Sequence, residues 1–190
     1  MIDLTRKQEK HKSKTSSSPF EKYDIDNKWG KGLSVSLGID NTNYKIDLSG
    51  ASETINIGSQ GDISLNYGWG IGEYIILDVG VCVVRTFGQY DNALGVKTIV
   101  TENPITLSVK WKYLGYIQGI GINYSSWTMR TTDGQNANVS PGLGYQYFIE
   151  YPMVLSEIGF IVKNGSLTEN GVTADLSSSG IYYKLKYYFN

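Results

Sequence analysis

The chain has 190 residues and a mass of 21.1 kDa, the length of one domain. Its 15 Tyr, 5 Phe, 4 Trp and 22 Gly favour β-sheet over a helical bundle. The formal net charge of −1 does not indicate a nucleic acid partner. The single cysteine, Cys82, excludes an intramolecular disulfide and a cysteine-based zinc site. No apolar run approaches the roughly 20 residues of a membrane-spanning helix.

Residues 1–28 differ in composition from the remainder of the chain. They are rich in lysine and include the turn-prone, low-complexity run from Lys14 to Pro19. We therefore expect two parts: a polar, mostly disordered N-terminal tail over 1–28 and one folded domain over 29–190.

From Trp29 onward, apolar and small or polar residues alternate with period 2 in eight successive segments. Such alternation predicts strands with two unlike faces, and the absence of a helical period between them predicts an all-β fold. Pro104, directly before the fourth segment, predicts a strand end or a bulge there. In chain order the segments are 33–39, 62–71, 75–84, 105–112, 119–124, 143–151, 157–162 and 180–189.

The connections between these segments alternate in length. Short turns are expected at 72–74, 113–115 and 152–155. Long loops are expected at 40–61, 86–103, 128–142 and 163–175, which contain turn residues such as Asp133-Gly134. In an up-and-down meander, all long loops then emerge at one end and all short turns at the other. This is the layout of an eight-stranded antiparallel transmembrane β-barrel.

A soluble, ligand-holding barrel of the lipocalin type would show the same alternation. Residue size separates the two architectures, because an eight-stranded barrel has an interior only wide enough for side chains to fill. The apolar face is bulky and uncharged, whereas the opposite face is rich in Gly, Ser, Thr and Asn. We therefore expect the apolar face to point outward, against lipid.

Aromatic residues gather near the ends of the predicted strands, as in the girdles of membrane barrels. A second, smaller group near the long-loop end comprises Tyr124, Trp127 and Tyr145. The girdle expected at the short-turn end consists of Trp69, Tyr74, Trp111, Tyr113, Tyr116, Tyr151, Tyr187 and Phe189.

The C-terminal segment Ser178-Ser179-Gly180-Ile181-Tyr182-Tyr183-Lys184-Leu185-Lys186-Tyr187-Tyr188-Phe189 resembles the closing strand of bacterial outer-membrane β-barrels. The family pattern is a polar residue and a Gly, then alternating hydrophobic and aromatic residues ending in Phe; here Asn190 follows the Phe. The strand number is similar to the small opacity-protein-like and OmpA-type domains. The residues that carry this assembly signal are Gly180, Tyr183, Leu185, Tyr187 and Phe189.

The resemblance implies an outer-membrane location, surrounding lipid and lipopolysaccharide, and recognition by the barrel assembly machinery. Because such a protein must be exported, we expect Met1 to stand where a leader peptide was removed. A monomer is expected, without nucleic acid, cofactor or metal.

Six ionisable residues fall on the small, lumen-facing side of the strands, in the half near the short turns. Three acids and three bases suit an ion-pair plug that satisfies its own buried charges; a polar path or gate is the alternative. These residues are Asp78, Lys110, Glu150, Glu157, Lys184 and Lys186.

Taken together, these features predict a non-enzymatic outer-membrane barrel. Its four long loops would bind a surface partner or host ligand, or the barrel would stabilise the envelope. A narrow channel for small solutes and a soluble lipocalin-like carrier are the alternatives. Two lipid-modifying enzyme families also use eight-stranded outer-membrane barrels and depend on a histidine near the outer leaflet. His11, the one histidine, lies in the tail at the opposite end, so we expect no enzymatic activity.

Overall fold

The computed structural model describes residues 30–48, 51–86, 88–91, 97–131, 136–151, 155–169 and 172–189, and nearly all of them are in β-strands. The predicted tail over 1–28 lies outside these residues. The strands are β1 (Gly32–Leu48), β2 (Ala51–Ile71), β3 (Ile75–Arg85), β4 (Gly88–Asp91), β5 (Lys97–Tyr113), β6 (Tyr116–Thr131), β7 (Asn136–Tyr151), β8 (Ser156–Glu169) and β9 (Val172–Tyr188).

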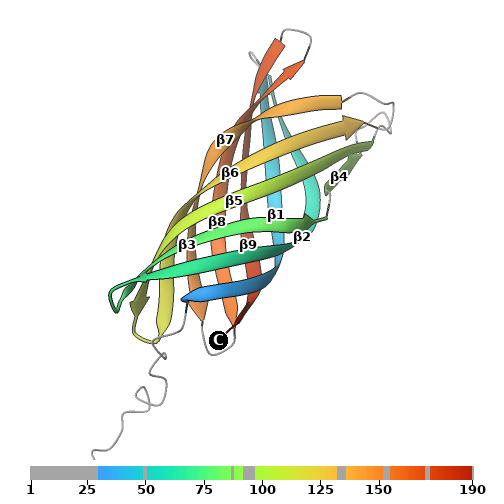
Figure 1. The fold of residues 1–190 in the computed structure, drawn as a ribbon. Helices are drawn as coiled ribbons and strands as arrows, with labels where there is room; N and C mark the ends of the chain where they lie inside the picture. Colours follow the sequence, from blue (N-terminus) through green and yellow to red (C-terminus); the bar gives the residue numbers. More distant parts are fainter. Residues whose placement is uncertain are drawn as a thin grey trace, which may run out of the picture.

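The strands form one antiparallel sheet that closes on itself (Figure 1). Sequential neighbours pair, and β9 pairs with β1 from Ser34↔Tyr188 to Asp47↔Asp175, which joins the two ends of the sheet. Strands β3 and β4 both pair with β5, so they form a single, interrupted pass of the chain. The result is the predicted up-and-down barrel of eight passes.

Tight turns at one end of the barrel confirm two of the three predicted short connections. Ile71 pairs with Ile75 across the β2–β3 turn, and Tyr113 pairs with Tyr116 across the β5–β6 turn. Gly72 and Gly115 have φ of 73° and 88°, a left-handed conformation that glycine adopts without steric cost. We call this end of the barrel the turn end. Residues 152–154 of the third turn lie outside the described residues.

The prediction of four long loops at 40–61, 86–103, 128–142 and 163–175 is wrong for most of the residues that the structure describes there. The strands of each hairpin continue through these segments: β1 and β2 stay paired up to Leu48↔Ala51, and β8 and β9 up to Glu169↔Val172. Asn, Ser, Gly and Thr had suggested loops, but in a sheet with a polar outer face they occupy ordinary outward positions.

Pro104 lies inside β5 and neither ends the strand nor forms a bulge. The pairing explains why proline is tolerated. β3 pairs with β5 at 105–111 and β4 pairs with it at 97–100, so among the described residues 101–104 are paired with β6 alone. Proline lacks an N–H for a second ladder, and it stands where that ladder is interrupted.

The barrel has two regions along its axis, which differ in the outward face of the strands. In the first, the belt, the outward side chains are large and apolar; it comprises 33–39, 63–71, 75–84, 105–113, 116–124, 143–151, 156–162 and 181–189. In the second, the extension, the same strands continue away from the turn end. The extension comprises 40–48, 51–62, 85–86, 88–91, 97–104, 125–131, 136–142, 163–169 and 172–180.

The two faces exchange character where belt meets extension. On β6, Ile120, Ile122 and Tyr124 point outward in the belt, and Ser126 and Thr128 follow on the same face; the inward face changes from Gly121 to Trp127.

Strand β9 shows the same exchange. Leu185 and Ile181 are exposed in the belt, whereas in the extension Leu176 is buried and Asp175 is exposed. The extension thus has a polar exterior, and its interior holds large apolar side chains such as Trp127 and Leu176 together with buried polar residues.

Candidate functional site: the closed lumen

The belt lumen contains a buried ion-pair cluster near the turn end. The Lys110 ammonium lies 2.9 Å from Asp78 and 3.5 Å from Glu150. Lys186 lies 3.2 Å from Glu150 and also pairs with Glu157. Five of the six residues expected in a lumen network are therefore joined in one cluster, which we call the lower cluster.

Two aromatic residues complete the lower cluster. The Tyr188 hydroxyl donates a hydrogen bond to Glu150. Lys110 and Lys186 lie 5.8 and 5.5 Å from the centre of the Phe148 ring, within reach of a cation–π interaction. Every charge has an opposite partner, as buried charges require.

Lys184, the sixth expected residue, is not part of this cluster. Its ammonium lies 4.0 Å from Asp62 and 5.3 Å from the centre of the Tyr182 ring, farther along the lumen toward the extension. Asp62 was not among the expected site residues.

A second buried cluster, which the sequence analysis missed, lies at the start of the extension. Arg85 pairs with Asp40 and lies 3.3 Å from Glu102, and Lys163 lies 2.6 Å from Glu102. The Tyr44 hydroxyl donates to Glu102 at 3.4 Å. We call these residues the upper cluster.

The upper cluster carried a signal in the sequence. Glu102 has the same parity as Lys110 on β5, and Lys163 has that of Ile161 on β8, so extending the alternation predicts that both face inward. They were missed because their segments were assigned to loops.

Burial of Glu102 acts to raise its pKa, but the neighbouring Lys163 and Arg85 outweigh burial and lower the pKa to about 2. Glu102 is therefore a carboxylate at neutral pH.

Small polar cavities lie between the two clusters. One of about 30 Å³ is lined by residues that include Asp40, Asp62, Arg85 and Lys163. One of about 10 Å³ lies next to Asp78, Glu157 and Lys186. A cavity needs roughly 10–15 Å³ to hold a water molecule, so these spaces fit isolated waters and no larger solute.

Apolar layers close the lumen on both sides of the clusters. Toward the extension, buried Tyr44, Val100, Trp127, Val139 and Leu176 pack together, and the Tyr44 and Trp127 rings meet edge-on at 5.3 Å.

At the turn end, Ile76 and Ile117 are fully buried. Both side chains pack against Gly30, which lies two residues before the start of β1. A Cβ added to Gly30 would lie 2.8 Å from the Ile76 side chain.

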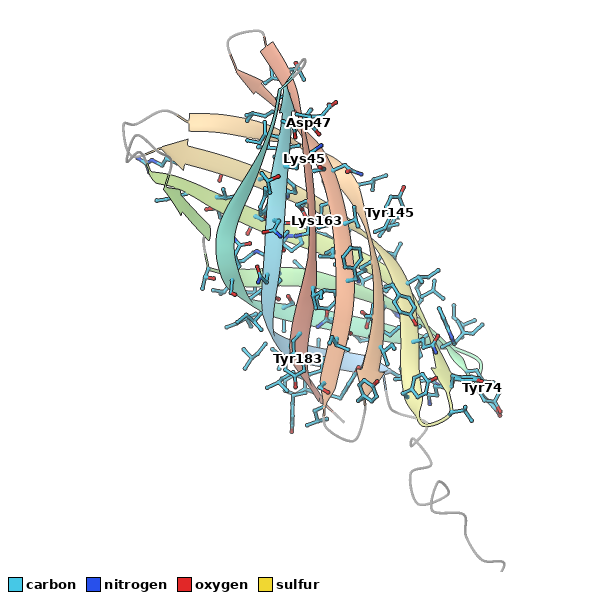
Figure 2. All side chains as sticks on the ribbon, turned by 180° about the vertical axis from the view of Figure 1, so that it is seen from behind. Lys45, Asp47, Tyr74, Tyr145, Lys163 and Tyr183 are labelled. Atoms are coloured by element: carbon cyan, nitrogen blue, oxygen red, sulfur yellow. The ribbon has the colours of Figure 1, made fainter. Side chains whose placement is uncertain are left out.

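The aromatic residues expected at the turn end lie there, on the outer surface. The rings of Tyr113 and Tyr116 meet edge-on with their centres 5.8 Å apart, and those of Tyr187 and Phe189 do so at 5.3 Å. Figure 2 shows Tyr74 at this end of the barrel, and Tyr145 and Tyr183 projecting outward. Exposed side chains of this girdle are Trp69, Tyr74, Tyr113, Tyr151, Tyr187 and Phe189, whereas Trp111 and Tyr116 are half-buried.

The expectation for Trp127 is wrong. It was placed in the second girdle with Tyr124 and Tyr145, but its side chain points into the extension and is 3% exposed. Tyr124 and Tyr145 are exposed on the belt. Position 127 has inward parity on β6, and the preference of Trp for membrane interfaces had been given more weight than that parity.

Among the residues that the structure describes, no group of three or more His, Cys, Asp or Glu is placed to hold a metal ion. The same residues contain no helix long and apolar enough to cross a membrane. The chemistry of the lumen, as described, is that of paired charges between apolar layers.

Comparisons with known proteins relate this geometry to solved barrels. The fold is similar to Neisserial surface protein A (NspA), with a TM-score of 0.49 and 11% identity, over 83% of this chain and 100% of that one. It is also similar to Ail, the attachment invasion locus protein of Yersinia pestis. That match has a TM-score of 0.41 and 10% identity, over 81% of this chain and 99% of Ail.

Ail in complex with the heparin analogue sucrose octasulfate matches with a TM-score of 0.40 and 8% identity, over 82% of this chain and 99% of that one. No protein-family model and no curated protein sequence matches the chain. At such identities the similarity concerns the barrel architecture alone.

Proposed function

We propose that this protein is a non-enzymatic, integral β-barrel of a bacterial outer membrane, which holds a rigid strand extension above the outer leaflet for partner binding. The observation that carries the proposal is the exchange of faces on continuous strands. On β6 the outward side chains are apolar over the belt, at Ile120, Ile122 and Tyr124, and polar over the extension, at Ser126 and Thr128, where Trp127 points inward.

A change of surroundings along the barrel, from lipid to water, accounts for this exchange. A water-exposed barrel that carried the belt's apolar surface would aggregate. A charge on a lipid face costs about 2–4 kcal/mol near the bilayer midplane, and the belt exposes large apolar side chains from every pass. In the extension the outward side chains are polar because water surrounds it.

Strand length supports the same arrangement. A tilted strand crosses a bilayer in about 9–11 residues, whereas β1 has 17, β2 has 21 and β9 has 17. In barrels of this type the short turns face the periplasm, so the extension stands on the outer surface. Assembly through Gly180, Tyr183, Leu185, Tyr187 and Phe189, a monomeric state and lipopolysaccharide as surrounding lipid belong to the same proposal.

A narrow channel is the second candidate, and it is favoured only by the polar cavities between the clusters. The two apolar layers and the paired charges oppose it. A soluble carrier would need the belt reversed, with its apolar face inward.

Reconstitution into lipid vesicles and planar bilayers tests the proposal. We expect the full chain to insert, to show heat-modifiable gel mobility, and to give no steady single-channel conductance. We expect K110M and E150Q to leave conductance near the wild-type level, because the apolar layers at Trp127 and Ile117 remain in place. A barrel that stays in solution without detergent would refute the membrane assignment. A large conductance in wild type, or a large rise in either variant, would favour the channel.

A further inference from the structure

A polar cavity of about 30 Å³ lies in the lumen between the lower and the upper cluster, and we call it the middle cavity. Side chains of β1, β2, β3, β5, β7, β8 and β9 line it, so it is enclosed by most of the barrel wall. Figure 2 shows Lys163, one of the lining residues, at mid-height of the barrel. The charged residues of the lining are Asp40, Asp62, Arg85, Lys163 and Lys184.

Several hydrogen-bond donors of this lining lack an acceptor. Tyr182 is 3% exposed, and its hydroxyl lies near Glu157 but forms no hydrogen bond of good geometry with a described residue. The Nε of the buried Arg85 also has no acceptor among these residues. The Lys184 ammonium lies 4.0 Å from Asp62, which is longer than a hydrogen bond.

The two carboxylates of the lining, in contrast, are engaged. Asp40 pairs with Arg85 and accepts a hydrogen bond from Thr42 at 3.2 Å. Asp62 accepts one from Ser64 at 2.7 Å. Buried polar groups in folded proteins are nearly always hydrogen-bonded, because a buried donor without an acceptor costs free energy. The middle cavity therefore lacks an acceptor.

The lower cluster differs in this respect. None of its side-chain nitrogen and oxygen atoms is among the buried atoms without a partner in the part of the chain that the structure describes. The unmatched donors thus belong to the lumen above it, where the middle cavity offers space for an acceptor.

The charges of the lining favour an anion over a metal cation. Three positive side chains and two carboxylates line the cavity. Lys163 is held by Glu102 at 2.6 Å, outside the lining, and Arg85 by Asp40, which leaves Lys184 as the least engaged cation. A metal ion would meet all three positive side chains. A water molecule would accept hydrogen bonds but would bring two hydrogens that need acceptors of their own, whereas a halide ion only accepts.

An interruption of the barrel wall gives access to the cavity. β3 pairs with β5 up to Val81↔Ile105, and β4 pairs with β5 from Gly88↔Val100 onward. Among the described residues, 82–86 and 101–104 have no backbone pairs with one another. Arg85 and Pro104 lie on the two sides of this interruption, and both line the middle cavity. Water and small ions can enter where no backbone ladder closes the wall.

We propose that the middle cavity binds one halide ion, chloride under ordinary conditions, between Arg85, Tyr182 and Lys184. A monatomic anion is close to a water molecule in size, and the cavity exceeds the roughly 10–15 Å³ that a water needs. The ion joins β3 to β9 where the belt meets the extension and so stabilises the barrel at that height. This inference goes beyond the proposed function and does not depend on the membrane or on a surface partner.

The first test uses the full chain in zwitterionic detergent micelles, with chloride alone as the probe. Chloride NMR should show excess line broadening that saturates and that bromide reverses, whereas inorganic phosphate, which is too large for the cavity, should not compete. K184M should weaken chloride binding by at least about tenfold and Y182F by about fivefold, since each removes a donor to the ion. The matched control K45M removes an outward lysine that pairs with Asp47 and should bind chloride as wild type does.

The second test measures stability, because a ligand that binds only the folded state stabilises it. At constant ionic strength, the urea midpoint of the wild type should be higher in sodium chloride than in sodium gluconate, whose anion is too large for the cavity. K184M should lose this difference and K45M should keep it. Y182F, which keeps all charges, should show a smaller difference and serves if K184M does not fold.

Equal line broadening in K184M, Y182F and wild type would overturn the proposal, as would equal midpoints of the wild type in the two salts, which would assign the cavity to water alone. Loss of binding in K45M to the same extent as in K184M, or competition by phosphate as strong as by bromide, would also overturn it by placing the ion on the outer surface. Insertion into lipid is measured separately, so neither test bears on the proposed membrane function.

Discussion

The belt and the extension are made of the same strands but are built on opposite principles. In the belt, the lumen is filled by paired charges such as Lys110 and Glu150, and the bulky apolar side chains face outward. In the extension, Tyr44, Trp127 and Leu176 form an internal apolar core and the outside is polar. The backbone alternation is the same in both regions, so the solvent around each region decides which face is apolar.

The comparison also shows what stabilises each region. Inside the belt, buried ion pairs satisfy one another's charges, and removal of one partner leaves an uncompensated charge. In the proposed membrane, lipid covers the outer face of the belt. The extension resembles a small water-exposed domain, with a core of few residues that excludes water.

The largest expected effect is destabilisation of the extension while the belt keeps its stability. Trp127→Ala removes the central side chain of the extension core and should destabilise that region by about 3–5 kcal/mol. Hydrogen exchange should rise in 40–48 and 125–131 while the belt stays protected. Trp127→Phe should be mild, because the indole nitrogen has no hydrogen-bond partner among the described residues.

Trp69→Ala supplies the contrast on the belt. Trp69 faces outward and packs on Tyr67 at 4.6 Å, so its loss should cost only about the 1 kcal/mol of an aromatic pair. If both Trp→Ala changes raised hydrogen exchange in the extension equally, the extension would not have a core of its own.

The next prediction compares the same substitution at two outward positions of β6, one in the belt and one in the extension. Ile120→Arg places a charge in the middle of the belt on β6 and should cost about 2–4 kcal/mol in lipid. Thr128→Arg makes the matched change in the extension and should stay within about 0.5 kcal/mol. Reversible urea unfolding in lipid vesicles measures both, and similar costs would show that the two heights share one environment.

The smallest effect concerns pH and is confined to the extension. Glu102 has a pKa of about 2 in the folded barrel, below the roughly 4.3 of an unfolded glutamate. Its ionised form therefore stabilises the extension above that value, and the contribution is lost as the pH falls toward 2.

Protease resistance of the extension should accordingly be constant from about pH 7 to 5 and decline below about pH 4. Glu102→Gln should loosen the extension at neutral pH and remove this decline, since Lys163 and Arg85 lose their shared partner. An unchanged decline in that variant would assign it to another group.

Much of the belt could be read from the sequence, because alternation places residues on faces without knowledge of partners. The outward apolar face, the turns at Gly72 and Gly115, and the inward parity of Lys110, Glu150 and Lys186 all follow from period 2. Lys184 shows the limit of that reading. Its inward parity was predicted correctly, but its contact with Asp62 depends on the register of the strands, which sets the height of each residue along the lumen.

The strands of the extension were not predicted because of their composition. Segments such as 163–169 and 172–180 are rich in Ser, Thr, Asn and Gly, which indicate loops when taken alone. The pairing of β8 with β9 makes them strands, and closure of the ring brings Asp40, Arg85, Glu102 and Lys163 together from four separate strands.

By itself, the sequence determined that this chain is an antiparallel barrel with one bulky apolar face, because side-chain alternation is a local property of a strand. The tertiary structure alone decided where the belt ends and the extension begins. The same alternation continues past Ile39 and Tyr124, and only closure of the ring shows that Tyr44 and Trp127 meet inside it. Whether a face is core or surface depends on what lies across the barrel, and that is a property of the closed sheet.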